Sequence, residues 1–278
     1  MVARRKNVII SVFSTTPGVG KTLTSINLSA GLAYDGYKVC LLDLDLQFGD
    51  VMNYLRLNSD RTIARAQRVF KNFSSTFNIR DFLVRYSYKQ LNFYILPAPR
   101  LVHDSYQIEV ATVMQFVDKY LQDFDFIVLD LNPMFSSLNL AMLDLSTLIT
   151  YVGTIDFLPA LKNFKVGYDA LIRFEYEEQK IRLIENRAGS QKVIKSEDVE
   201  RLLGGTFYHR LPNDFISANK SIEEGVPLMF SSPTSELSKS FLELASRYTN
   251  KYTIEPVREI EQQTSKGFFS RTLDALFG

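Results

Sequence analysis

The chain has 278 residues, 46% of them hydrophobic, and is therefore long enough to bury one large core or two small ones. Its 32 basic and 31 acidic side chains give a formal net charge of +1, which argues against the strong positive field of a dedicated nucleic-acid binder. The single cysteine, Cys40, excludes a disulfide framework and an intramolecular metal cage made only of cysteines.

The N-terminus, MVARRKNVIISVF, combines a basic start with an apolar run, as a secretory signal does. The run is short, however, and continues into a loop instead of a small-residue cleavage site, so we interpret it as a first strand. Uncharged stretches such as LSTLITYVGTI are shorter than the roughly 20 residues that a membrane-spanning helix needs. We therefore expect a cytoplasmic protein without a membrane span, in which Cys40 is a buried small hydrophobe.

Strand-like runs alternate with helical patterns along the whole chain. Several of the runs are apolar on both faces, which is typical of parallel strands covered by helices on each side. We therefore predict a doubly wound, mostly parallel α/β sheet of about seven strands, with helices on both faces. The runs span residues 7–13, 38–44, 92–98, 124–131, 147–153, 180–186 and 206–212. The basic, aromatic-rich segment 57–90 is the least regular, and we expect it to form helices over one sheet edge.

The stretch STTPGVGKT, residues 14–22, lies between the first predicted strand and a helical pattern that ends near Gly36. This is the context of a phosphate-binding loop. Gly18 and Gly20 allow backbone N–H groups to surround an anion, and Lys21 supplies a cation at the helix N-terminus. Thr22 follows at the position where a hydroxyl can bind Mg²⁺.

The usual pattern of such a loop has a glycine five residues before Gly20, where this chain has Thr15. The stretch is closer to the deviant phosphate loop of the MinD/ParA family, K-G-G-V-G-K-T. Residues 18–22 match that motif, whereas Thr16 stands at its signature lysine and Pro17 replaces its first glycine.

Three other segments resemble the same family, and the match extends over roughly residues 7–248. CLLDLDLQFGDV resembles its second-strand motif, in which Asp45 matches the carboxylate that positions the attacking water. FIVLDLNP resembles its magnesium-associated strand, which ends at Asp130. RLIENR and HRLPND resemble the segments that enclose the adenine, through Asn186 and Pro212.

The resemblance implies an ATP site with Mg²⁺ and assigns residues to it. Lys21 and Asp45 would be catalytic. The nucleotide would contact Pro17, Gly18, Val19, Gly20, Lys21, Thr22, Leu23, Asn186 and Pro212, and the metal would lie near Thr22, Asp43 and Asp130. Each assignment has a structural alternative. The aspartates could cap helices or face water, and Asn186 and Pro212 could be ordinary loop and turn residues.

Within the family, four segments together resemble the TadZ/CpaE branch, which helps to position and assemble Tad-type pilus machinery at a cell pole. They are LDLDLQFGDV, LPAPR, LSTLITYVGTIDFLPALKN and LPNDFISANKSIEEGVPL. Many members of that branch carry an N-terminal receiver-like domain. This chain begins at the ATPase core, so we expect the input of such a domain to be absent or supplied by another protein.

Thr16 is the departure with the largest expected effect. In the resembling family the signature lysine reaches across a dimer interface to the partner's nucleotide, and threonine has neither that charge nor that reach. An arginine supplied to phosphoryl transfer elsewhere contributes about 10³- to 10⁵-fold in rate. We therefore expect ATP binding through Lys21 and Thr22 with weak or slow hydrolysis.

The C-terminus has its own pattern. We predict an ATPase domain at 1–250, a polar tether at 251–265 and an amphipathic helix at 266–278. The helix resembles the membrane-targeting C-terminus of MinD, which implies binding to the inner membrane surface through Lys266, Phe268, Phe269, Arg271, Leu273, Leu276 and Phe277. Docking of the same helix on protein is the alternative.

Two functions remain open. The first is a spatial switch, in which ATP favours a homodimer that binds the membrane at a cell pole. This dimer would recruit pilus or secretion proteins. The second is a scaffold that keeps the fold and a nucleotide without cycling. A DNA-partition ATPase is disfavoured by the near-neutral charge, although residues 61–89 are basic. An iron–sulfur reductase is disfavoured because no cysteine pair exists.

Overall fold

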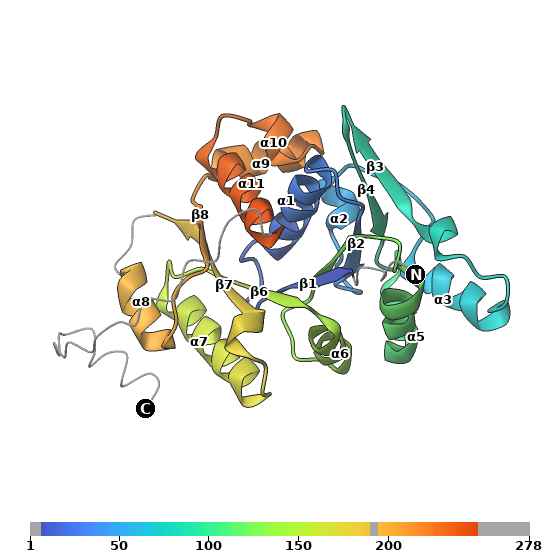
Figure 1. Ribbon diagram of the computed structural model, residues 1–278, viewed down its shortest axis with the longest axis horizontal. Coiled ribbons are helices and arrows are strands. Elements are labelled where there is room, and N and C mark those ends of the chain that lie inside the picture. Colours follow the sequence, from blue (N-terminus) through green and yellow to red (C-terminus); the bar gives the residue numbers. More distant parts are fainter. Residues whose placement is uncertain (1–6, 190–193, 250–278) are drawn as a thin grey trace, which may run out of the picture.

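The structure is a computed structural model that describes residues 7–189 and 194–249 (Figure 1). Its strands are β1 (Val8–Phe13), β2 (Val39–Leu44), β3 (Val84–Tyr88), β4 (Leu91–Leu96), β5 (Phe126–Leu131), β6 (Leu148–Gly153), β7 (Ile181–Ala188) and β8 (His209–Pro212). They form one sheet in the order β3-β4-β2-β5-β1-β6-β7-β8, in which every neighbouring pair except β3 and β4 is parallel.

Helices cover both faces of this sheet (Figure 1). One face lies under α1 (Lys21–Tyr34), α2 (Val51–Tyr54), α9 (Phe215–Glu224), α10 (Leu228–Ser231) and α11 (Glu236–Tyr248). The other lies against α3 (Ile63–Asn72), α5 (Val110–Gln115), η2 (Phe116–Tyr120), α6 (Ser137–Leu145), α7 (Leu158–Arg173) and α8 (Ser196–Leu203). The remaining short helices are η1 (Ile79–Phe82), α4 (Val102–Ser105) and η3 (Glu178–Lys180).

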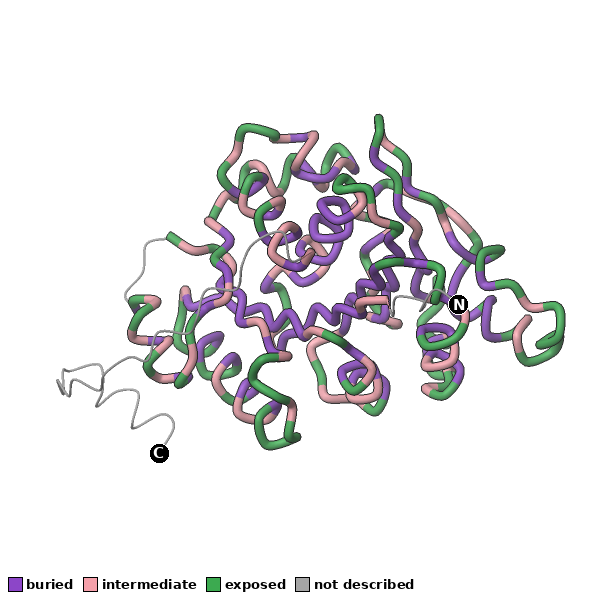
Figure 2. Tube along the Cα trace, viewed as in Figure 1, coloured by how far each residue is buried: buried purple, intermediate pink, exposed green. Residues whose placement is uncertain are grey.

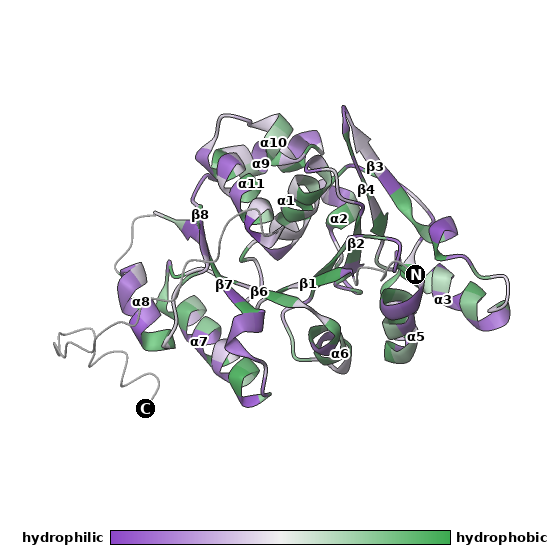
Figure 3. Ribbon diagram, viewed as in Figure 1, coloured by the Kyte–Doolittle hydropathy of each residue, from purple (hydrophilic) through white to green (hydrophobic). Residues whose placement is uncertain are grey.

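The central strands are apolar on both faces because each face packs against a helical layer. In β2, for example, Val39 and Leu41 belong to the core under α1, whereas Cys40, Leu42 and Leu44 belong to the opposite core. The central part of the sheet is accordingly buried and hydrophobic (Figures 2 and 3). The predicted doubly wound fold and the predicted burial of Cys40 are therefore confirmed.

Within the described residues the sheet has eight strands, one more than the expected number of about seven. The expectation for the segment 57–90 needs correction, because this segment is not only helical. It contains α3 and η1, as expected, but then forms β3, which pairs antiparallel with β4 from Val84↔Ile95 to Tyr88↔Leu91. A strand at the sheet edge needs only one neighbour, and the two-residue connection at 89–90 supplies a hairpin.

Helix α1 is buried almost all round instead of on one face, because α11 packs over it. A Cβ on Gly31 would come within 2.7 Å of the Ala245 side chain, so this contact requires a glycine. The close packing fixes the N-terminus of α1 directly after the loop that follows β1.

The parallel strands all end at the same edge of the sheet, where ligands bind in this architecture. The loop at residues 14–20 and the turns after β2, β5, β6 and β7 meet there. In the described part of the chain, no helix combines the length and apolar character needed to cross a membrane. The tether and amphipathic helix predicted for 251–278 lie outside the described residues.

Candidate functional site

The phosphate loop follows β1 and ends at Gly20, which caps α1 in a left-handed conformation with a φ of 92°. A side chain at this position is excluded twice, because its Cβ would also lie 2.5 Å from Nδ2 of Asn186. Gly18 is left-handed as well, with a φ of 71°. No side chain of the described residues caps the first turn of α1, so its N–H groups are left for another acceptor.

Lys21, the first residue of α1, is 8% exposed. Burial lowers the pKa of its ammonium group, and the charges of Asp130 and Asp45 partly oppose that shift. A desolvated cation beside carboxylates is favourable only if the group is paired or receives an anionic ligand. Lys21 is therefore placed inside the site and not on the protein surface.

Asp130 stands near the end of β5 and is 1% exposed. Its two carboxylate oxygens accept hydrogen bonds from the first turns of α1: Oδ2 from Thr22 Oγ1 at 2.7 Å and Oδ1 from Ser25 Oγ at 2.9 Å. Burial raises the pKa of Asp130 to about 6, against the opposing effect of these hydroxyls and of Lys21. The carboxylate thus joins β5 to the helix that begins at the loop.

Asp43 is the neighbour of Asp130 in register on β2 and is equally buried. Its Oδ2 accepts a hydrogen bond from the Val51 backbone at 3.1 Å, whereas its Oδ1 is buried and accepts none from the described residues. Burial, and next the charge of Asp130, raise the pKa of Asp43 well above its usual range. Gly49 packs so closely that a Cβ there would lie 2.5 Å from the carboxylate.

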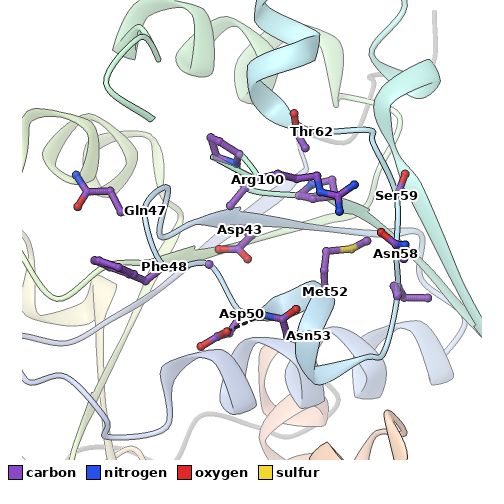
Figure 4. Close-up of a pocket in the computed structure, with 15 residues that line it drawn as sticks. Asp43, Gln47, Phe48, Asp50, Met52, Asn53, Asn58, Ser59, Thr62 and Arg100 are labelled. Atoms are coloured by element: carbon purple, nitrogen blue, oxygen red, sulfur yellow. Dashed lines mark hydrogen bonds between the residues drawn. The ribbon is translucent and has the colours of Figure 1, made fainter. Parts of the chain in front are cut away.

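A cavity of about 470 Å³ opens beside Asp43, under the segment 47–53 and the turn after β4 (Figure 4). Asp50, Asn53 and Arg100 also line it. Lys21, Thr22 and Asp130 do not, so this cavity lies beside the loop site and Asp43 stands between the two.

Asp45 follows β2 and is half-buried. Burial raises the pKa of its carboxyl group, while a hydrogen bond from the Phe48 backbone and the charge of Lys21 lower it. The structure therefore brings Asp45 into electrostatic range of Lys21.

Thr16 contributes no charge to the site and turns its hydroxyl inward. Its backbone N–H donates to Ser14 Oγ at 3.1 Å, and its Oγ1 is buried without a partner among the described residues. The preceding Thr15 anchors the loop to the far side, donating from Oγ1 to the Asn163 carbonyl at 2.7 Å and contacting the Tyr151 hydroxyl at 2.7 Å.

The other side of the loop is held by β7. Asn186 Nδ2 donates to the Val19 carbonyl, and Arg187 Nη2 donates to the Gly18 carbonyl, both at 2.8 Å. Pro212 lies on β8 beside Ala188 and lines a separate cavity of about 540 Å³ with Arg210 and Lys239. Asn186 thus touches the loop directly, whereas Pro212 is one strand farther away.

The remaining predicted nucleotide contacts lie along the loop and into α1. Pro17 and Gly18 are exposed, Val19 is buried, and Leu23 is half-buried. Their positions agree with a loop whose rim faces solvent and whose base is packed.

The donors and acceptors fit a phosphate group with its cation. Lys21 and the first turn of α1 suit an anion. The buried Oδ1 of Asp43, which has no partner among the described residues, suits a hard divalent cation with bound water, together with Thr22 and Asp130. Within residues 7–189 and 194–249 no cluster of three or more His, Cys, Asp or Glu could hold a metal by itself. A cation here would thus need phosphate oxygens as additional ligands.

Three contributors were missed from the sequence. Ser25 shares a helix face with Lys21 and Thr22, a spacing of four and three residues that could have indicated it. Arg187 directly follows a predicted contact residue. Tyr151 lies within a predicted strand, and nothing local distinguishes it from a core residue.

Comparison with known proteins agrees with this geometry. Residues 7–154, more than half of the chain, match the AAA_31 family, described as AAA domain. The chain belongs to this family of MinD/ParA-type P-loop ATPases.

Among curated proteins, the chain is similar to the septum site-determining protein MinD of Thermotoga maritima. The two are 27% identical over 86% of this chain and 87% of that protein. The fold of this chain is similar to that of a ParA family ATPase from Chlorobium tepidum, with a TM-score of 0.77 and 21% identity over 86% of this chain and 98% of that one. It is also similar to MinD of Pyrococcus horikoshii in complex with Mg-ADP, with a TM-score of 0.73 and 21% identity over 88% and 97%.

The raised pKa of Asp130 gives a first prediction. In the folded protein this group takes up a proton below about pH 6, but in the unfolded chain only below about 3.8, so between these values the folded state binds more protons. Its contribution to stability is therefore present at low pH and lost as the pH rises through about 6. We predict that the free energy of unfolding of the nucleotide-free protein, relative to Asp130→Asn, falls by up to about 3 kcal/mol between about pH 4 and 7.

Urea unfolding at both pH values measures this difference. The exposed Asp118→Asn serves as control for removal of a carboxylate and should keep the wild-type dependence on pH. A difference between wild type and Asp130→Asn that stays constant over the range would contradict the prediction.

Proposed function

We propose that the protein binds ATP with Mg²⁺ at residues 14–22 and acts as a nucleotide-dependent spatial regulator of the MinD/ParA type. The observation that carries this proposal is the pair of buried side chains Lys21 and Asp130 at the carboxyl edge of the sheet, with the half-buried Thr22 donating to Asp130. Phosphate oxygens would contact Lys21 and the loop backbone, and Mg²⁺ would lie near Thr22, Asp43 and Asp130. Asn186, which would lie near the adenine, already donates a hydrogen bond to the loop at the Val19 carbonyl.

Slow hydrolysis follows from the same arrangement. Mg²⁺ supplies neutralisation of the phosphate charge when it is bound. Asp45 would orient the attacking water, because it is half-buried at the site and in electrostatic range of Lys21. Thr16 offers no cation, and its hydroxyl points away from the loop surface. Transition-state stabilisation at that position is therefore missing.

A non-cycling scaffold is the second candidate, and the inward hydroxyl of Thr16 is the observation that favours it. In that case a nucleotide would stay bound as part of the structure. The two candidates agree on binding and differ in turnover and release.

An apolar rim around the site supports a homodimer. Nine of the fourteen exposed large hydrophobic side chains in the described residues lie on segments that follow a parallel strand at this edge. They are Phe48, Leu101, Val102, Tyr106, Met134, Phe157, Leu158, Phe215 and Ile216. Exposed apolar groups gathered at one side indicate a surface that is covered in an assembly. We infer that a second copy docks over the loop edge when nucleotide is bound.

The biological setting is the finer part of the proposal. The likeness of LPAPR and LPNDFISANKSIEEGVPL to the TadZ/CpaE branch favours positioning of Tad-type pilus or secretion machinery at a cell pole, with assembly proteins of that machinery as partners. The segment 266–278 would attach the protein to the inner membrane surface, since in a helix its large apolar side chains would share one half of the surface. These side chains are Phe268, Phe269, Leu273, Leu276 and Phe277.

The first test replaces Lys21. Lys21→Ala removes the buried cation of the site, so we predict loss of ATP binding and of any ATP-dependent dimer. Sedimentation velocity with and without Mg-ATP measures the dimer, and the exposed Lys119→Ala is the matched control. A dimer that forms equally with Lys21→Ala would show that the loop does not control assembly.

The second test separates turnover from binding. Asp45→Ala should leave ATP affinity within about threefold of wild type, because the carboxylate acts on water and not on the phosphates. It should remove the phosphate release that the wild type shows. Undiminished phosphate release from Asp45→Ala would exclude the role of this residue, and absence of release from the wild type would favour the scaffold.

The third test addresses the membrane. Deleting residues 266–278 should release the protein from anionic liposomes without changing its nucleotide affinity. Co-sedimentation with liposomes measures binding, and Phe268→Ser with Phe269→Ser provides a milder variant with the same expected direction. If the deletion instead lowers the melting temperature by many degrees and leaves liposome binding unchanged, the segment belongs to the folded core.

A further inference from the structure

The loop lacks a cation at position 16 but has one from another part of the chain. Arg187, at the end of β7, extends its guanidinium to the Gly18 carbonyl, two residues beyond Thr16, at a distance of 2.8 Å. Arg187 and Lys21 are both cations, and the structure places both at the loop. They differ in setting, since Lys21 is buried at the base and Arg187 is exposed at the rim.

The backbone that carries Arg187 is unusual. Arg187 has a φ of 56°, in the left-handed region that side chains rarely adopt. The pairing of β7 with β8 shifts register between Glu185 and Ala188, around this residue. Strand irregularities and left-handed residues collect beside functional sites, where they redirect a side chain. Here the irregularity turns Asn186 and Arg187 together toward the phosphate loop.

A local hydrogen bond maintains this turn. The Arg187 backbone N–H donates to Oδ1 of Asn186 at 2.9 Å, while the amide nitrogen of the same Asn186 side chain holds the Val19 carbonyl. One asparagine side chain thus fixes both the loop and the conformation that directs Arg187 to it. The backbone conformation from which the Arg187 side chain extends is therefore set by the fold.

The charge balance of the site calls for a further cation. Asp130 and Asp45 act on Lys21, Asp43 adds a third carboxyl group beside them, and a nucleoside triphosphate would add several negative charges. A guanidinium carries five N–H donors in a planar fork, and Nη2 of Arg187 donates to the Gly18 carbonyl. Arginine is suited to keep such a backbone contact while it binds a phosphate oxygen.

We propose that Arg187 is the second cation of the phosphate site, supplied within the same chain by β7, and that it binds the terminal phosphate of the nucleotide where residue 16 provides no charge. This inference rests on the proposed ATP site and adds a residue to it. The same contact also allows a purely structural role, in which Arg187 only holds the loop in shape.

The two roles predict different nucleotide dependence. A residue that only holds the loop affects ATP and ADP alike, because both use the same loop. A cation at the terminal phosphate affects ATP and leaves ADP nearly unchanged. Calorimetric titration of the full chain with Mg-ATP and Mg-ADP therefore distinguishes them, with Arg187→Gln, Arg187→Lys and, as matched control, the exposed Arg173→Gln at the end of α7.

We expect Arg187→Gln to weaken ATP binding about 10- to 100-fold and ADP binding by less than about threefold. Arg187→Lys and Arg173→Gln should stay within about fivefold of wild type for both nucleotides. Thr16→Lys, added to Arg187→Gln, should restore part of the preference for ATP, because it returns a cation to the loop.

Equal weakening of ATP and ADP by Arg187→Gln would overturn the inference, as would failure of both lysine substitutions to preserve or restore the preference for ATP. Wild-type titration tests the proposed function separately. Lack of ATP binding by the wild type would overturn the ATP site itself together with this inference, whereas binding without any effect of Arg187→Gln would overturn the inference alone.

Discussion

Asp43 and Asp130 are two buried carboxyl groups that lie side by side on β2 and β5. The arrangement around them depends on which donors and cations balance their charge. Thr22 and Ser25 donate to Asp130, and Lys21 brings a buried ammonium group. One oxygen of Asp43 accepts no hydrogen bond from the part of the chain that the structure describes. Burying such groups lowers the stability of the fold unless a ligand supplies the missing partners. These buried carboxyl groups lie at the carboxyl edge of the sheet, beside the first turn of α1 and the glycines of the loop, which suit an anion.

The sequence predicted the parts of this arrangement that local chemistry encodes. The doubly apolar strands, the glycines at 18 and 20 and the position of Lys21 were all recognisable, because each depends on residues within one strand, loop or helix. Contacts between distant segments were not. The hydrogen bond from Arg187 to Gly18 joins residues 169 positions apart. Strand β3 was missed because it lies at the sheet edge and pairs only with β4, so its sequence lacks the apolar run of a central strand.

Thr16 and Arg187 together decide how this ATPase fold would be used. A threonine with an inward hydroxyl removes a charge that could cross to a second copy, whereas an arginine from β7 stays within its own chain. A site completed in this way would bind nucleotide without requiring a dimer, and the apolar rim would then govern assembly separately. Nucleotide occupancy and dimer formation could thus be coupled more loosely than where the cation comes from the partner.

Calorimetric titration of the full-length wild-type protein with ATP, with and without Mg²⁺, tests the central claim most directly. The buried carboxylates and Lys21 predict a single saturable site whose affinity increases when Mg²⁺ is present. The cation would balance the charge of Asp43 and Asp130, while the phosphates would pair with Lys21. Absence of saturable binding, or binding that is independent of Mg²⁺, would contradict the account and leave a P-loop fold whose buried charges serve another purpose.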